Sequence, residues 1–199
     1  MTVRRTVTGM MAAAILIMNS GCARSPVVTF YTMSALAPET ASATADPRGI
    51  AVGPVTVPDL VDRPQLVTRI SANKVNILES HRWAEPLKSE IPRLLAENLA
   101  RLMSSARVST YDQSASRTAD YRVVVDIQRF ESVPGEGVTI EALWSVRRGA
   151  NGMVEKGHSI AREPDAGTGY EALVAAHGRA LATISKDLAR ALTISMSQP

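Results

Sequence analysis

The stretch YRVVVDIQRFESVPGEGVTIEALWSV, residues 121–146, decides the fold. Apolar residues occupy every second position in both of its halves: Tyr121, Val123, Val125 and Ile127, then Val138, Ile140, Ala142, Trp144 and Val146. A period of two is typical of a strand that buries one face. Pro134 to Gly137 between the halves form a turn signal. The stretch therefore predicts two antiparallel strands.

Further strand signals lie on both sides of this pair. Asn151-Gly152 is a strong hairpin signal, and it leads to a third strand at 154–160, which completes an antiparallel meander. Upstream, apolar runs predict strands at 27–33, 50–57, 65–70 and 74–78. The last two are close enough for a tight turn at Ser71–Asn73.

Two segments carry the apolar stripe of a helix. In EPLKSEIPRLLAENLARLM, residues 85–103, we expect Ser89 to cap the helix, because Pro92 then falls in the first turn, where its missing N–H is harmless. The second helix begins at the capping box Thr168–Glu171 and runs through Leu192. The predicted fold class is α+β: a mainly antiparallel or mixed sheet with two principal helices packed on one face.

The N-terminus has the layout of an export signal. Arg4 and Arg5 precede the apolar run 10–18, and Gly21-Cys22 resembles a bacterial lipobox, although Asn19 stands where leucine is usual. We expect cleavage before Cys22 and acylation of this cysteine, palmitate included. A free buried thiol, or an ordinary signal peptide with a chance cysteine, remain the alternatives.

This assignment sets the domain organisation. Residues 1–21 are a lipoprotein signal peptide, 22–36 the lipidated N-terminus with the first strand, and 37–49 a flexible loop. Residues 50–199 complete one α+β domain. Cys22 is the only cysteine, so no disulfide supports the fold. Residues 1–21 hold two of the 22 Lys and Arg residues and none of the 19 acids, so the remaining chain is nearly neutral. Near-neutrality without a basic cluster argues against nucleic-acid binding.

No catalytic constellation is visible in the sequence. It contains no nucleophile elbow, no H-E-x-x-H zinc pair and no P-loop. We expect His81 on a loop, His158 on a strand and His177 as a packing residue of the last helix. His158 and Ser159 are neighbours on a strand and point to opposite faces, so they cannot act as a pair. The prediction is a protein without catalytic activity, metal or cofactor, apart from the lipid on Cys22.

Residues 53–87 carry an irregular mixture of Pro, Asp, Arg and Gln that helical or strand periodicity would not produce. VPDLVDRPQLV (57–67) and RWAEPL (82–87) are similar to signature elements of the PqiC (YmbA) family, the auxiliary lipoproteins of MCE-type lipid transporters. LLAENLARLM (94–103), YRVVVDIQRF (121–130) and GYEALVAAHGRALATISKDLA (169–189) continue the resemblance. Val61, where leucine is usual, and Pro92 depart from the pattern.

The resemblance implies a lipoprotein on the periplasmic face of the outer membrane. In such systems an inner-membrane protein extends MCE domains as a tube across the periplasm, and the lipoprotein docks or receives its end and supports membrane integrity. Ala23 after the cysteine, in place of Asp, resembles lipoproteins sent to the outer membrane. Partners are the tube protein and the membrane, with a homo-oligomer left open.

We predict that a turn region and a nearby tryptophan form the partner-binding surface: Pro58, Asp59, Leu60, Arg63 and Trp83. Arg and Trp are frequent at interface hot spots. The alternative is a rigid sheet corner in which Trp83 fills the core and Arg63 pairs with an acid.

Two other functions compete with this one. A stand-alone lipid carrier would need an internal cavity lined by residues such as Val125, Ile140 and Trp144. An envelope hydrolase would depend on His158 or Ser159.

Overall fold

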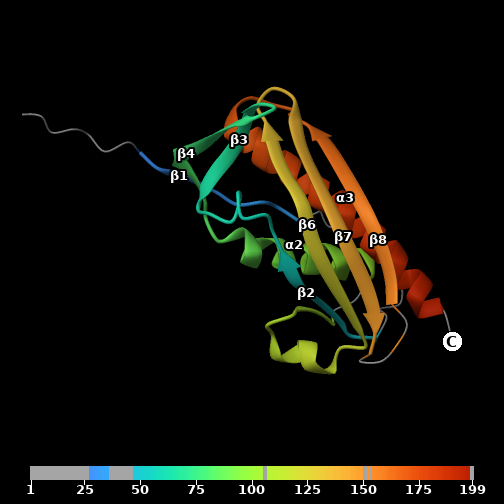
Figure 1. Cartoon of the computed structure of the whole chain (residues 1–199). Helices are drawn as coiled ribbons and strands as arrows, with labels where there is room; N and C mark the ends of the chain where they lie inside the picture. Colours follow the sequence, from blue (N-terminus) through green and yellow to red (C-terminus); the bar gives the residue numbers. More distant parts are fainter. Residues whose placement is uncertain (1–26, 36–46, 105–106, 150–151, 153, 198–199) are drawn as a thin grey trace, which may run out of the picture.

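The computed structural model describes residues 27–35, 47–104, 107–149, 152 and 154–197 (Figure 1). The signal peptide, Cys22 and most of the 37–49 loop lie outside these ranges. Within them the chain forms β1 Thr29–Tyr31, β2 Ile50–Thr56, β3 Gln65–Ser71, β4 Lys74–Trp83, α2 Leu87–Leu102, β5 Val108–Thr110, the 3-10 helix η1 Ser114–Thr118, β6 Tyr121–Val133, β7 Gly137–Arg148, β8 Val154–Pro164 and α3 Gly169–Ser197.

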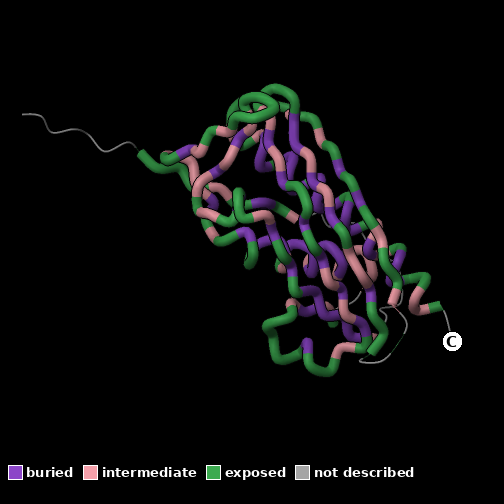
Figure 2. Tube along the Cα trace, viewed as in Figure 1, coloured by how far each residue is buried: buried purple, intermediate pink, exposed green. Residues whose placement is uncertain are grey.

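The larger sheet has five strands in the order β5-β2-β6-β7-β8. The predicted antiparallel meander is confirmed, since β6 pairs with β7 and β7 with β8 in antiparallel register. Along much of β6 and β7 buried positions alternate with half-buried or exposed ones, as Figure 2 shows. β2, in contrast, runs parallel to both β5 and β6, so the sheet is mixed.

A smaller sheet has the order β1-β4-β3. β3 and β4 form an antiparallel hairpin around the predicted tight turn. β4 continues to Trp83, five residues past the predicted end at Leu78, and β1 pairs parallel to this continuation, with Phe30 opposite Arg82. His81 therefore lies on a strand, and its expected place on a loop is wrong. The pairing with β1 joins distant segments, so the local pattern could not reveal it.

Both helices cover one face of the five-stranded sheet. α2 packs on β2 and β5, α3 packs mainly on β7 and β8, and the helices contact each other. Asn98 and Ser185, both fully buried, join them through a 3.1 Å hydrogen bond. The largest fully buried side chains are Tyr121, Ile50, Leu87, Ile91, Leu94, Leu95, Leu99, Ile140, Leu173, Leu181, Ile184 and Leu188. The α+β class with helices on one face is confirmed.

α2 begins earlier than the sequence suggests. Its first residue is Leu87, and the carbonyl of Pro86 accepts hydrogen bonds from the N–H groups of Ser89 and Glu90 at 2.8 and 3.0 Å. The expected cap at Ser89 is therefore wrong, and Pro92 lies inside the helix. Such a proline costs about 3 kcal/mol. The early start brings Leu87 into the core at 1% exposure, and this burial offsets part of the cost.

No helix within the described ranges is long and apolar enough to cross a bilayer.

Candidate functional site

The turn between β2 and β3 contains most of the predicted partner-binding residues. The carbonyl of Pro58 accepts hydrogen bonds from the N–H groups of Val61 and Asp62 at 3.0 and 3.2 Å. Val61 is 6% exposed and anchors the turn in the core, whereas Leu60 is 42% exposed and Asp59 is also exposed. The turn thus presents Asp59 and Leu60 outward on a fixed backbone.

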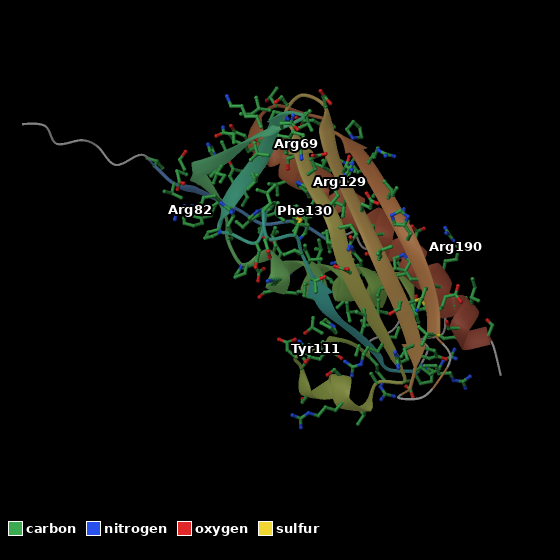
Figure 3. All side chains as sticks on the ribbon, in the orientation of Figure 1. Arg69, Arg82, Tyr111, Arg129, Phe130 and Arg190 are labelled. Atoms are coloured by element: carbon green, nitrogen blue, oxygen red, sulfur yellow. The ribbon has the colours of Figure 1, made fainter. Side chains whose placement is uncertain are left out.

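A groove of about 430 Å³ lies beside this turn. Its walls come from the turn, the β3–β4 hairpin and β6, and its apolar lining is Pro58, Leu60, Val61, Val67, Ala72, Val75 and Phe130. Arg69, Arg129 and Glu131 add charge to the lining, and Arg69 forms an ion pair with Glu131. Figure 3 labels Arg69, Arg129 and Phe130. The site is therefore an apolar groove with charged side chains among its walls.

Trp83 lies in the core, with 6% of its surface exposed. Its ring meets the rings of Phe130 and His177 edge-on, at centroid distances of 6.1 and 6.0 Å. Trp83 does not line the groove itself. It contacts the ring of Phe130, and Phe130 lines the groove. In this structure Trp83 offers a partner little surface of its own.

Arg63 is half-buried, and its Nε is buried without a hydrogen-bond partner. The described ranges show no ion pair between Arg63 and an acid. One of the two acids of this turn, Asp62, pairs with Lys88 of α2 at 2.5 Å, and this hydrogen bond raises the pKa of the lysine. The turn is thereby fastened to α2.

His177 lies under the groove as a buried packing residue. Its ring stacks on Phe130 at 4.1 Å, and its Nε2 lies 2.7 Å from the hydroxyl oxygen of Ser132. Complete burial lowers the pKa of His177 to about 3, because the charged imidazolium would lose its hydration. The imidazole is therefore neutral at physiological pH.

The residues that a hydrolase would need are separated. His158 Nε2 lies 2.9 Å from Glu141 on the exposed face of the sheet. Ser159 is buried on the other face, where its hydroxyl donates to Asp187 at 2.7 Å and accepts from the Trp144 indole N–H at 2.9 Å. His158 and Ser159 therefore do not meet.

The side chains expected to line a lipid cavity are engaged in packing. Val125 and Ile140 are fully buried in the core, and the ring of Trp144 covers Gly157, where an added Cβ would lie 2.0 Å from it. Within the described ranges no three His, Cys, Asp or Glu residues are grouped so that they could hold a metal ion.

A buried carboxylate that the sequence analysis missed holds the N-terminal segment. Glu90 is 0% exposed, and its Oε1 accepts hydrogen bonds from the Thr32 hydroxyl at 2.7 Å and the Met33 N–H at 2.6 Å. Its Oε2 is buried without a partner, and burial raises its pKa. The available signal was spacing: Glu90 lies three residues after Leu87 and four before Leu94, which places it on the apolar stripe.

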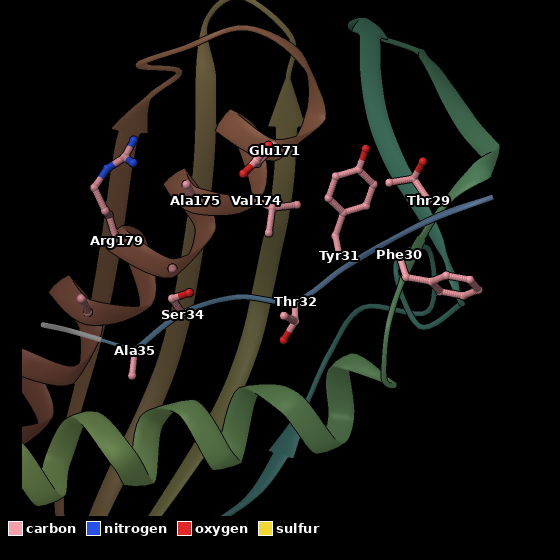
Figure 4. A pocket seen from close by; sticks show the side chains of 12 residues that line it. Thr29, Phe30, Tyr31, Thr32, Ser34, Ala35, Glu171, Val174, Ala175 and Arg179 are labelled. Atoms are coloured by element: carbon pink, nitrogen blue, oxygen red, sulfur yellow. The ribbon is translucent and has the colours of Figure 1, made fainter. Parts of the chain in front are cut away.

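Beside this segment lies a second groove, of about 570 Å³, between residues 29–35 and α3 (Figure 4). The segment runs between α3 and α2, close to α3 because Gly178 has no side chain: a Cβ there would lie 2.9 Å from the Ser34 carbonyl oxygen. The lining mixes Phe30, Tyr31 and Val174 with Glu171 and Arg179.

Comparisons with known proteins agree with this architecture. The model of a family described as ABC-type transport auxiliary lipoprotein component matches residues 31–189. The crystal structure of protein XCC0632 from Xanthomonas campestris is similar, with 18% identity, a TM-score of 0.66 and coverage of 81% of this chain and 93% of that one. A second similar crystal structure is that of an uncharacterized protein, with 20% identity, a TM-score of 0.66 and coverage of 83% of this chain and 99% of that one. At these identities the likeness shows the fold alone. A search of the curated proteins finds no match.

Proposed function

Because the chain belongs to the family of ABC-type transport auxiliary lipoprotein components, we propose that it serves an MCE-type lipid transporter as a lipid-anchored, non-catalytic subunit. Acyl chains on Cys22 hold it on the periplasmic face of the outer membrane. There it docks or receives the end of the tube that an inner-membrane MCE protein extends. By completing this path it supports membrane integrity.

The observation that carries the docking role is the turn that exposes Asp59 and Leu60 beside the 430 Å³ groove. Apolar walls with charged residues among them suit a protein segment, whose side chains fill the groove while its polar groups meet the charges. The turn is fixed by hydrogen bonds and by Val61, so binding orders little additional chain. Arg63 and Arg129 add the residue type that most often anchors such contacts.

The short distance between anchor and body also supports this role. Val27, the first described residue, follows Cys22 by five positions, which an extended chain spans in about 18 Å. A body attached so closely stays beside the bilayer, where the end of a tube would arrive. Two or more acyl chains are needed for stable attachment.

Site-specific crosslinking tests the docking surface. A photoreactive amino acid replaces Leu60 in one strain and Leu143 in a control strain. Leu143 is a suitable control because its exposure, 46%, is similar to the 42% of Leu60 and it lies on a different surface. We expect irradiation of intact cells to join the Leu60 variant, and not the Leu143 variant, to a protein with MCE domains. Equal crosslinking from both positions, or none from position 60 while the protein is present in the envelope, would contradict the proposal.

A further inference from the structure

Apolar side chains are concentrated where the chain from Cys22 enters the folded body. Val27 is 87% exposed, Val28 37% and Phe30 64%. The described ranges hold nine large exposed hydrophobic residues in all, so a third of them fall within these four positions. Single exposed apolar residues are ordinary, whereas a group of them marks a contact surface. We call Val27, Val28 and Phe30 the entry patch.

The backbone of β1 directs Phe30, the largest member of this patch, away from the core. Phe30 points to the opposite side from Thr29 and Tyr31 (Figure 4). Tyr31 faces inward, where its hydroxyl lies 2.9 Å from His81 Nδ1. Val27 and Val28 directly precede β1 and are exposed beside it. Among the described residues β1 is an edge strand of its sheet, and no other described strand pairs with it on its outer side.

The entry patch is also held firmly in place. The carbonyl of Tyr31 accepts a 2.7 Å hydrogen bond from the Ala84 N–H. Two residues later Met33 is 4% exposed and its N–H is bound by Glu90. Phe30, which lies within β1, therefore occupies a fixed position on the body.

We propose that the entry patch inserts into the lipid surface beside the anchor. This inference rests on the acylation of Cys22 in the proposed function, which keeps Val27 within about 18 Å of the acylated residue. Arg82, opposite Phe30 in the sheet, lies 3.6 Å from Glu79, so the neighbouring charges compensate each other. Because the side chains of the patch itself are apolar, we expect the contact to depend little on salt. Its effect is to fix the orientation of the body on the bilayer.

A fluorescent label tests this insertion in the full lipoprotein. Cys22 is the only cysteine and is acylated, so a Phe30→Cys variant carries one free thiol for an environment-sensitive dye. Leu143→Cys, at an exposed position on the sheet, is the matched control. Both are reconstituted into vesicles of phosphatidylethanolamine and phosphatidylglycerol. We expect nitroxide-labelled lipids to quench the dye at position 30 but not at position 143, and aqueous iodide to quench it several-fold less at position 30.

Three other outcomes overturn the inference. If both variants float with the vesicles and iodide quenches both dyes equally, the anchor holds but the patch does not insert. If position 30 is protected from iodide without quenching by nitroxide lipids, a second copy of the chain covers the patch. If neither variant floats, the acylation in the proposed function fails, and the insertion loses its premise.

Discussion

The carboxylate of Glu90, buried on α2, accepts a hydrogen bond of 2.6 Å from the backbone N–H of Met33, 57 residues earlier in the chain. The same oxygen binds the hydroxyl of Thr32 at 2.7 Å. One carboxylate thus fixes the N-terminal segment against the helices. Removing it would leave a buried N–H without a partner, which costs more than the hydrogen bond itself contributes.

We therefore expect Glu90→Ala to lower the free energy of unfolding by about 2–4 kcal/mol. Urea denaturation measures the change, and faster hydrogen exchange at the Met33 N–H locates it. Glu97→Ala is the control on the same helix, because Glu97 is 42% exposed and its ion pairs with Arg93 and Arg101 are worth at most about 1 kcal/mol. Equal losses in both variants would show that Glu90 has no special role.

His177 should make stability depend on pH. Its pKa is about 3 in the folded protein and about 6.5 in the unfolded chain. The contribution of neutral His177 to the free energy of unfolding is complete above pH 6.5. It declines as the pH falls toward 3, because only the unfolded chain binds the proton in this window. The slope reaches about 1.4 kcal/mol per pH unit. Urea denaturation at several pH values measures it.

The matched variant is His177→Phe, which retains a ring against Phe130 but cannot titrate. Its stability should fall less steeply than that of the wild type between pH 6.5 and 4. The raised pKa of Glu90 acts in the opposite sense, since the folded state then binds the additional proton, but it is common to both proteins and cancels in the difference. Parallel pH profiles would refute the assignment.

Gly157→Ala should destabilise the sheet where Trp144 crosses it. The new Cβ would lie 2.0 Å from the indole ring, which cannot move without losing its 2.9 Å hydrogen bond to Ser159. Overpacking of this kind costs about 1–3 kcal/mol. Thermal unfolding measures the loss, and Trp144→Leu in the same background should recover part of it. A loss that is the same with Trp144 and with Leu at position 144 would exclude the clash as its cause.

Pro92→Ala should stabilise the protein by about 1–2 kcal/mol. Proline inside a helix lacks the N–H for the preceding turn and crowds its carbonyl, whereas alanine restores the bond at a half-buried position. Part of the gain is lost because alanine increases the freedom of the unfolded chain. Chemical denaturation of the wild type and of the variant measures the difference in the free energy of unfolding. A decrease in stability would mean that the ring contributes more by packing than it costs the helix.

Arg63→Ala should weaken recovery of the MCE protein in a pull-down while changing stability by less than about 1 kcal/mol. The reason is that its buried Nε has no partner to lose. Thermal unfolding is recorded on the same preparation. A large loss of stability with unchanged recovery would assign Arg63 to the fold alone, as the sheet-corner alternative holds.

The sequence predicted those features that depend on neighbouring residues. The alternation in β6 and β7, the turn before β4 and the start of α3 at Gly169 are local patterns, and the structure contains all of them. The parallel pairings of β1 with β4 and of β2 with β6 join distant segments and leave no local mark. β5 has three residues, too few for a period to emerge.

The candidate site divides in the same way. The turn at Pro58–Arg63 was recognisable because proline and aspartate fix its backbone locally. The groove beside it could not be foreseen, since β6 and the β3–β4 hairpin form its walls only after folding. Trp83 was chosen by residue type, but type does not determine burial. Its place in the core depends on Phe130 and His177, which lie far away in sequence.

The parallel alignment of β1 with β4 determines how the body resists tension at its N-terminus. A force that draws Val27 outward runs along β1, so the hydrogen bonds between the two strands are loaded in shear and must break together. The buried link between Met33 and Glu90 lies behind them and would have to break as well. Mechanical strength is thus concentrated at the first few residues of the fold, where a tethered protein experiences its load.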